Sequence, residues 1–171
     1  MEIMNNLKQW IKNNFYSRTS KHLNPGIIIL LIFILSISYC LVRKEPEKVW
    51  NLRGKIVLLA KSLAGLPYRY GGHEIDGFDC SGFVYYVYDS FGIKLPRTAK
   101  KQAMLKEKIK LKRAQPADIV VFKLRRGWHT AIYIGGNSFI HAPNKQSRVR
   151  KEALDKFWKN RLRYVIKIIE E

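Results

Sequence analysis

The sequence predicts an α+β fold in which N-terminal helices pack on one small antiparallel sheet. Residues 56–64 carry apolar side chains at helical spacing, and residues 80–91 form a second, amphipathic to buried segment. Beyond Pro116, short apolar runs alternate with turn residues, as expected for strands. Helical patterns therefore come first and strand patterns second, an order typical of helices segregated from an antiparallel sheet.

Shorter elements complete this prediction. Gly65 and Gly92 are plausible ends for the two helices. We further expect a short helix near residues 96–105, a strand at 118–122, a strand hairpin at 128–142, a short helix at 153–159 and a last strand at 163–169. The hairpin should turn at Gly135-Gly136-Asn137, since these residues favour tight turns.

The N-terminal part divides into a basic leader and an apolar segment. Residues 1–24 carry four Lys and Arg against one Glu, and residues 23–42 contain no charged side chain. At about 1.5 Å per residue, a helix of this length spans about 30 Å, roughly the core of a bilayer. We therefore expect one transmembrane or signal helix over residues 25–42, with Pro25 at its first position.

Three forms of membrane insertion are considered for this segment: an uncleaved signal anchor, a cleaved secretory signal, and a lipoprotein signal with a lipid on Cys40. Against a cleaved secretory signal, the basic leader is long and no small-residue cleavage site follows the segment. Against a lipoprotein signal, Tyr39 is larger than the residue that usually precedes a lipidated cysteine. Basic residues flank both ends, so charge does not orient the segment. The forms that remain tether the rest of the chain to a membrane.

The remaining chain is expected to contain a linker over residues 43–50 and one domain over residues 51–171. Of the 32 Lys and Arg residues, 28 lie at or beyond residue 43, together with 12 of the 13 acidic residues. The excess of 16 positive charges therefore belongs to this region and favours an anionic partner. No nucleic-acid-binding motif accompanies the basic runs, so nucleic acid is not the expected partner.

One of the two cysteines lies in the stretch GFDCSGFV, between polar residues at the start of a predicted helix. A thiol becomes nucleophilic near a helix N-terminus or beside an imidazolium. Asp79 is the expected N-cap and Ser81 lies in the first turn, so Cys80 meets the first condition. Cys40 lies in the apolar segment, so a disulfide between the two cysteines is not expected.

Two of the four histidines are candidates for the second condition. His129 opens the first strand of the predicted hairpin and His141 ends the second, so the two lie nearly opposite each other. Such a pair suits a base and the residue that orients it. A zinc ion bound by Cys80 and both histidines is an alternative, but no CxxC or HxxxH pair supports it. We therefore expect neither a metal nor another cofactor.

Taken together, the motifs resemble a known family. LPYRYGG, DCSGFV, LPRTAKKQ, QPADIVVF, WHTAIYIG and FIHAP follow the order and spacing of the NlpC-type cell-wall cysteine peptidases, which have a papain-like fold. The match covers roughly residues 53–169. The resemblance implies hydrolysis of an amide in the peptide stem of peptidoglycan, usually between D-glutamate and a diamino acid.

The resemblance also implies a catalytic triad. Cys80 would be the nucleophile that forms an acyl-enzyme, His129 the general base that takes its proton, and His141 the polar residue that orients His129. The backbone N–H of Cys80 would serve the oxyanion hole, a role that suits a helix N-terminus.

Further positions correspond to substrate-binding residues of the family. Tyr68 matches a tyrosine that helps to bind the substrate or the oxyanion, and Asp79 and Ser81 match positions that face the peptide stem. The chain departs from the family pattern at Ala117, where glycine is usual. If this position requires a positive φ, the turn is expected to shift slightly.

These observations lead us to expect a membrane-tethered cysteine endopeptidase in the envelope of a bacterium. Residues 25–42 would hold it in the membrane, its catalytic domain would lie outside the cytoplasm, and its substrate would be peptidoglycan stem peptides. Two alternatives remain at this point. One is an acyl transferase on the same fold, and the other is a non-enzymatic membrane protein that binds an anionic polymer.

Overall fold

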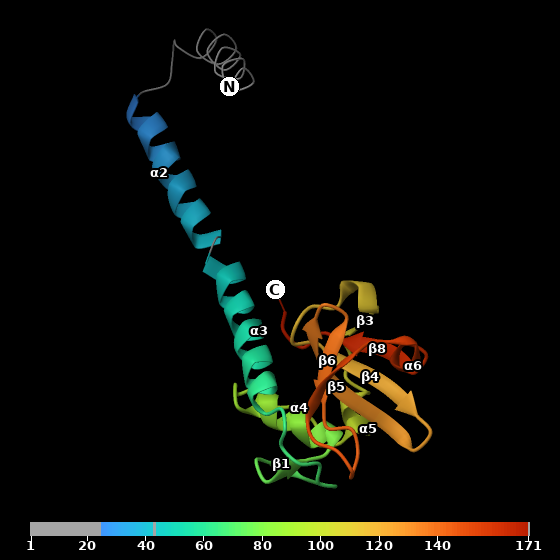
Figure 1. Cartoon of the computed structure of the whole chain (residues 1–171). Coiled ribbons are helices and arrows are strands. Elements are labelled where there is room, and N and C mark those ends of the chain that lie inside the picture. The colour runs from blue at the N-terminus through green and yellow to red at the C-terminus, as the bar shows by residue number, and fades with distance from the viewer. Residues whose placement is uncertain (1–24, 43, 171) are drawn as a thin grey trace, which may run out of the picture. The chain divides into compact units, whose positions relative to one another are not determined.

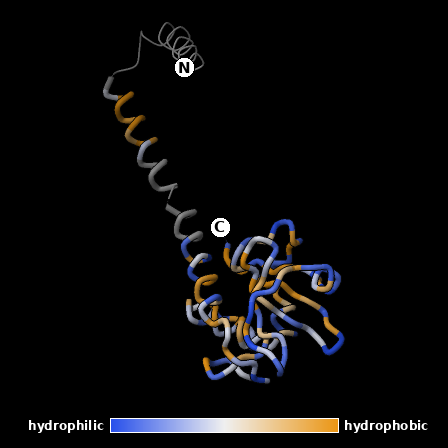
Figure 2. The backbone as a smooth tube through the Cα atoms, in the orientation of Figure 1, coloured by the Kyte–Doolittle hydropathy of each residue, from blue (hydrophilic) through white to orange (hydrophobic). Residues whose placement is uncertain are grey.

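The computed structural model describes residues 25–42 and 44–170, and the chain separates into two compact units between residues 45 and 46. Helix α2 (Pro25–Val42) in the first unit starts at the expected proline. Its residues 27–35 are all large, apolar and exposed, and form the hydrophobic stretch in Figure 2. Within the described ranges, no helix has both the length and the apolarity needed to cross a membrane. The expected leader, residues 1–24, and the side chain of Cys40 lie outside the described residues.

Helix α3 (Lys44–Ser62) is longer than the sequence predicts. The segment 43–50, expected to be a linker, is helical from residue 44 onward. Pro46 does not interrupt the helix because it lies in the first turn, where a backbone N–H has no helical partner. The chain leaves the helix at Gly65, whose φ of 91° confirms the predicted stop.

A six-stranded antiparallel sheet forms the centre of the second unit (Figure 1), with the strand order β3-β8-β4-β5-β6-β7. Its strands are β3 (Lys108–Ile109), β4 (Ile119–Leu124), β5 (Gly127–Gly135), β6 (Ser138–His141), β7 (Arg150–Ala153) and β8 (Leu162–Ile166). A separate two-stranded sheet pairs β1 (His73–Glu74) with β2 (Gly77–Phe78). Most helical residues precede the large sheet, so the predicted α+β class is confirmed.

Apolar side chains cover both faces of the large sheet. Ile119 and Val121 of β4 belong to a cluster with α3 and with α4 (Cys80–Asp89), as expected for helices packed on the sheet. Val120 and Phe122 point to the opposite face, where they cluster with Trp158 of α6 (Lys156–Lys159). Successive residues of β4 are therefore buried on alternate faces. This explains why its sequence is a continuous apolar run.

The C-terminal part contains a strand that the sequence did not predict. A helix was expected over residues 153–159, whereas helix α6 covers only Lys156–Lys159 and the preceding Arg150–Ala153 forms β7. Strand β7 pairs only with β6, at the edge of the sheet. Charged side chains are usual on edge strands, so this segment lacks the apolar alternation that identifies inner strands.

The turn before β4 keeps the backbone conformation that glycine usually adopts. Ala117 has a φ of 68°, so the alanine itself occupies the left-handed region. A residue with a Cβ pays about 1–2 kcal/mol for this conformation. The backbone N–H of Ala117 donates to the carbonyl of Tyr133 at 2.8 Å, and its carbonyl accepts a hydrogen bond from the Tyr88 hydroxyl. These buried hydrogen bonds hold the strained residue in place.

A buried ion pair joins helix α3 to the sheet. The side chains of Arg53 and Asp118 are each 1% exposed, and Nη1 of the arginine lies 2.9 Å from Oδ1 of the aspartate. The same guanidinium donates to the carbonyls of Pro116 and Ile169 at 2.8 Å. The arginine thus connects α3 to the turn before β4 and to the chain after β8.

We expect Asp118→Leu to lower the free energy of unfolding by about 3–5 kcal/mol, because the Arg53 guanidinium would stay buried without its anion. Urea unfolding followed by circular dichroism measures the change. The double variant Arg53→Met/Asp118→Leu should recover part of the loss. Asp89→Asn, in a surface pair with Lys94, is the control and should leave the unfolding midpoint nearly unchanged. An equal loss of stability in Asp118→Leu and in Asp89→Asn would contradict this account.

Candidate active site

Helix α4 presents Cys80 at its first position. Asp79 precedes it as N-cap, and its Oδ1 accepts a hydrogen bond from the backbone N–H of Gly82 at 2.6 Å, which confirms the predicted cap. Cys80 itself is partly exposed. It therefore lies at the positive end of the helix dipole, within reach of a ligand.

Two glycines allow the preceding loop to pass close to the start of α4. A Cβ atom on Gly82 would lie 1.9 Å from the carbonyl oxygen of Gly72, and one on Gly72 would lie 2.2 Å from the carbonyl oxygen of Gly77. The same Gly72 carbonyl accepts a hydrogen bond from the backbone N–H of Asp79 at 3.0 Å. The glycines of YGG and DCSG are therefore required by the close approach of two backbone segments.

Arg97, which the sequence did not single out, completes the anchoring of Asp79. Its guanidinium donates to both carboxylate oxygens, at 3.0 and 2.9 Å, and to the Gly72 carbonyl at 2.9 Å. The hydroxyl of Ser81, which is buried, donates to Oδ1 of Asp79 at 3.1 Å. Burial raises the pKa of Asp79, but the hydrogen bonds from Arg97 and Gly82 outweigh it and hold the pKa below its usual value. Asp79 and Ser81 are thus engaged by protein groups at the edge of the site.

The β5–β6 hairpin brings the two predicted histidines together. It turns at Gly135 to Asn137, as expected, and Ile132 lies opposite Ile140 in its register. His141 consequently lies diagonal to His129, and Nε2 of His129 is 2.8 Å from Nδ1 of His141. Both side chains are buried, with exposed fractions of 4% and 0%. Of the other two histidines, His73 lies on β1 and His22 lies outside the described residues.

Aromatic rings enclose this pair of imidazoles. Trp158 stacks on His129 with ring centroids 5.7 Å apart and meets His141 edge-on at 5.2 Å. Phe122 and Phe139 contact the pair from the sheet. Burial, and secondarily the neighbouring His141, lowers the pKa of His129 to about 3, and burial also lowers the pKa of His141. Both imidazoles are therefore neutral near pH 7, the state that a general base requires.

Cys80 and His129 line the same cleft, which has a volume of about 1500 Å³. Burial raises the pKa of the thiol to about 11, and the Asp79 carboxylate acts in the same direction. The resting thiol is thus protonated and needs a base to become a nucleophile. Tyr68, half-buried, also lines the cleft, and burial followed by the charges of Cys80 and Asp79 raises its pKa.

Gln102 of α5 (Ala99–Gln102) connects the elements that carry Cys80 and His129. Its Nε2 donates to the carbonyls of Ser81 and Pro96 at 3.0 and 2.9 Å, and its Oε1 accepts from the Thr130 hydroxyl at 2.8 Å. The side chain is fully buried. One amide therefore holds the neighbours of both Cys80 and His129, a role that sequence reasoning missed because its partners are distant in the chain.

Glu152 of β7 is a second residue that sequence reasoning missed. Its Oε1 lies 2.6 Å from Nε of Arg150 and 3.4 Å from Nε2 of His141, and its Oε2 accepts a hydrogen bond from Nε1 of Trp158 at 2.5 Å. The interaction with His141, followed by those with Arg150 and Trp158, lowers the pKa of Glu152 to about 2. An unpredicted strand thus delivers an anionic carboxylate to the outer side of the histidine pair.

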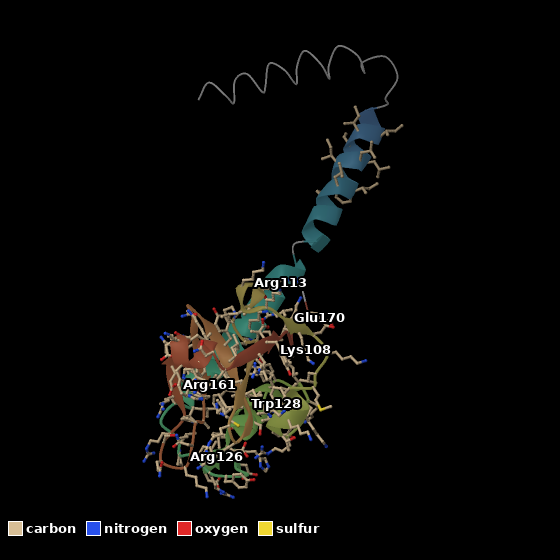
Figure 3. The ribbon with its side chains drawn as sticks, turned by 90° about the vertical axis from the view of Figure 1, so that its right-hand side faces the viewer. Lys108, Arg113, Arg126, Trp128, Arg161 and Glu170 are labelled. Atoms are coloured by element: carbon tan, nitrogen blue, oxygen red, sulfur yellow. The ribbon has the colours of Figure 1, made fainter. Side chains whose placement is uncertain are left out.

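The cleft is strongly basic. Among the described residues, Arg125 and Arg126, from the β4–β5 turn, form no ion pair, and Arg161 packs 3.6 Å over the ring of Phe157. Figure 3 shows Arg126 and Trp128 in this part of the molecule. The basic lining residues are Arg97, Arg125, Arg126, Lys145, Arg150 and Arg161. Such a surface attracts an anionic ligand. The part of the chain that the structure describes holds no group of three His, Cys, Asp or Glu side chains arranged to bind a metal.

We expect stability to decrease below pH 6.5. A histidine whose pKa is lower in the folded state stabilises the fold above its unfolded value of 6.5, and this contribution is lost as pH falls toward the folded value, about 3 for His129. The contribution of Glu152 to stability is likewise lost as pH falls from 4.5, its unfolded pKa, to about 2, its folded pKa. Urea unfolding at pH 4.5 to 8 tests this expectation. His129→Gln should show a shallower decrease between pH 7 and 4.5; a slope equal to that of the unsubstituted protein would contradict the assignment.

Comparison with known proteins matches this domain to a family. The NlpC/P60 family matches residues 65–167. "Probable endopeptidase NlpC" of Escherichia coli (strain K12) is 35% identical over 140 residues, which cover 76% of this chain and 91% of that protein. "Gamma-D-glutamyl-L-lysine dipeptidyl-peptidase" of Bacillus subtilis (strain 168) is 36% identical over 83 residues, or 46% of this chain and 28% of that protein.

A solved structure gives the same result. The NlpC/p60 domain of peptidoglycan hydrolase SagA superimposes with a TM-score of 0.60 at 31% identity, covering 67% of this chain and 97% of that one. The residues that match the family, 65–167, include helix α4 with Cys80 and the β5–β6 hairpin with His129 and His141. The chain therefore belongs to the NlpC/P60 family.

Proposed function

We propose that this protein is a cysteine endopeptidase that hydrolyses an amide bond in the peptide stem of peptidoglycan. The observation that carries this proposal is the position of a partly exposed cysteine, at a helix N-terminus, in the same cleft as His129, whose Nε2 lies 2.8 Å from Nδ1 of the buried His141. A nucleophile, a base and a residue that orients the base are the components of cysteine-dependent acyl transfer. The relatives named above, an endopeptidase and a glutamyl dipeptidyl-peptidase, support the same chemistry.

In the proposed mechanism, His129 takes the proton of Cys80 as the sulfur attacks the substrate carbonyl. Because Nε2 of His129 is engaged with His141, Nδ1 is the atom left to receive this proton. The high pKa of the thiol and the low pKa of the imidazole favour the neutral pair at rest, so proton transfer accompanies the attack. The backbone N–H of Cys80 and the Tyr68 hydroxyl would stabilise the oxyanion.

The remaining steps return the enzyme to its resting state. The protonated His129 donates its proton to the departing amine, which leaves a thioester on Cys80. A water molecule, deprotonated by His129, then attacks the thioester, the bond to sulfur breaks, and the acid product is released. The proton passes from His129 back to the Cys80 sulfur. His141 keeps the imidazole ring of His129 oriented in both halves of the reaction.

We propose a D-glutamyl–diamino acid bond as the site of cleavage. Stem peptides carry several carboxylates, and the basic side chains that line the cleft complement them. Asp79 and Ser81 would act mainly by shaping the edge of the site, since Arg97 and Gly82 already occupy the Asp79 carboxylate. The Tyr68 hydroxyl, by contrast, forms no hydrogen bond with another described residue and is available to a ligand.

We expect Cys80→Ala to reduce kcat/KM by at least about a thousandfold while the fold is retained. The full-length protein in detergent is incubated with defined stem peptides, and the products are identified by mass spectrometry. Cys40→Ser removes the other cysteine and should cleave like the unsubstituted protein. Equal cleavage by the Cys80→Ala variant would disprove the proposed nucleophile.

The same experiment separates the two alternative functions. Transfer of the acyl group to an added amine would indicate a transferase, and salt-dependent polymer binding without cleavage would indicate a binding protein.

We further propose that residues 25–42 tether the protein to a membrane of the bacterial envelope, with the catalytic domain outside the cytoplasm. Nine consecutive apolar side chains are exposed on α2, at residues 27–35, and they project from it in Figure 3. An uncharged apolar surface of this kind favours lipid over water.

Fractionation with an alkaline carbonate wash tests the tether. The full-length protein should remain with the membrane pellet, and a variant lacking residues 2–42 should be released. The mass of the purified protein separates the two forms of anchoring, since a lipoprotein would begin at a lipidated Cys40 and an uncleaved signal anchor would keep the residues before it. Retention of the truncated variant in the pellet would argue against a tether at residues 25–42.

A further inference from the structure

We propose that Glu152 is a positioning residue that selects the tautomer of His141 and, through it, makes His129 competent as a base. The inference rests on the proposed cysteine endopeptidase function and adds a fourth residue to its proposed machinery. It is drawn from the geometry of β6, β7 and α6, where the Glu152 carboxylate meets the outer nitrogen of the histidine pair.

Because His141 can either donate or accept, the direction of its hydrogen bond with His129 is not fixed by the residue type. The 2.8 Å contact between Nε2 of His129 and Nδ1 of His141 holds a single proton in the neutral pair. If His141 donates it, the proton of His129 lies on Nδ1, which then has no lone pair to accept the Cys80 proton. If His129 donates it, Nδ1 is free. Only the second arrangement makes His129 a base.

The position of Glu152 favours the second arrangement. When Nδ1 of His141 accepts, its own proton lies on Nε2, and Oε1 of Glu152 is 3.4 Å from that atom. This contact is long for a hydrogen bond and is mainly electrostatic. Nε2 is buried and has no other hydrogen-bond partner among the residues that the structure describes. A carboxylate only accepts, so it stabilises an N–H at Nε2 and repels a lone pair there.

The surroundings of Glu152 keep it anionic and fixed. Arg150 donates to Oε1 and Trp158 donates to Oε2, and neither donor group can act as an acceptor. The Trp158 ring also stacks on His129, so one side chain fixes both the carboxylate and the base. The charged groups that face the histidine pair are Glu152, Arg150 and the more distant Asp79. With the Glu152 charge removed, Arg150 is left as the nearest charge.

Glu152 also affects the charge that develops during catalysis. When His129 takes the Cys80 proton, it becomes an imidazolium hydrogen-bonded to His141, and the anionic carboxylate stabilises this positive charge. The proton stays on His129 until it passes to the leaving amine, and Glu152 remains ionised throughout. Removing its charge should therefore lower the pKa of the histidine pair and slow the chemical step.

We test this with the full-length protein carrying Glu152→Gln, which removes the charge at nearly constant volume. We expect kcat to fall about tenfold to a hundredfold with KM near that of the unsubstituted protein. The acid limb of the kcat/KM profile should move to lower pH by about one unit, because the base has lost an anionic neighbour. Glu152→Asp should restore part of the rate. Glu74→Gln, the same substitution at an exposed carboxylate of β1 outside the cleft, is the matched control.

A second measurement does not depend on turnover. Nitrogen-15 NMR of the histidines in the Cys80→Ala variant should show His141 protonated at Nε2 and His129 protonated at the nitrogen facing it. A proton on Nδ1 of His141 would overturn the proposal even if Glu152→Gln failed to fold. A rate and pH profile of Glu152→Gln equal to those of Glu74→Gln would overturn it as well. Absence of cleavage by the unsubstituted protein would reject the endopeptidase function instead, and the NMR result would still decide the role of Glu152.

Discussion

The hydrogen bonds of Gln102 are the interaction on which the geometry of the cleft depends. Its amide group binds the carbonyl of Ser81, next to Cys80, and the hydroxyl of Thr130, next to His129. It therefore joins helix α4 to strand β5. Helix and strand also pack through apolar side chains, whose contacts are less directional than hydrogen bonds. Because the amide is fully buried, loss of any partner would leave a polar group without compensation. The relative position of thiol and imidazole is thus set by a side chain that does not react.

Burial decides the electrostatic state of the reacting groups. The aromatic enclosure keeps both histidines neutral, and burial of the sulfur, with the nearby Asp79 carboxylate, keeps the Cys80 thiol protonated. Cys80, His129 and His141 are therefore uncharged at rest, although charged side chains line the cleft around them. In the proposed mechanism, the charge that forms during attack would be stabilised by groups already in place: the helix N-terminus at the oxyanion and the Glu152 carboxylate behind the histidines. Preorganisation of this kind avoids rearrangement of the protein during the reaction.

The fold tolerates local strain where buried contacts compensate for it. Ala117 occupies a left-handed conformation without the freedom of glycine, held by hydrogen bonds to Tyr133 and Tyr88. The adjacent Asp118 is paired with Arg53, so the turn before β4 is fixed on both sides. This turn precedes the strand that pairs with β5 and so supports the histidine hairpin. Alanine is thereby accommodated at this position by the hydrogen bonds and the ion pair of the turn.

The sequence alone determined the elements whose signals are local. The cap at Asp79 and the turn at 135–137 depend on residue types within a few positions, so the start of α4 and the β5–β6 hairpin follow from them. From these elements Cys80 and the histidine pair were identified as candidates.

Only the tertiary structure decided which distant side chains support these candidates. Arg97, Gln102 and Glu152 make their important contacts with residues far away in the chain or across the sheet. Strand β7 has no periodic apolar pattern, because it is a charged strand at the edge of the sheet, and so neither the strand nor its carboxylate was foreseeable. Local sequence specifies a helix start or a turn, but the partner of a buried polar group is chosen by the packing of the whole domain.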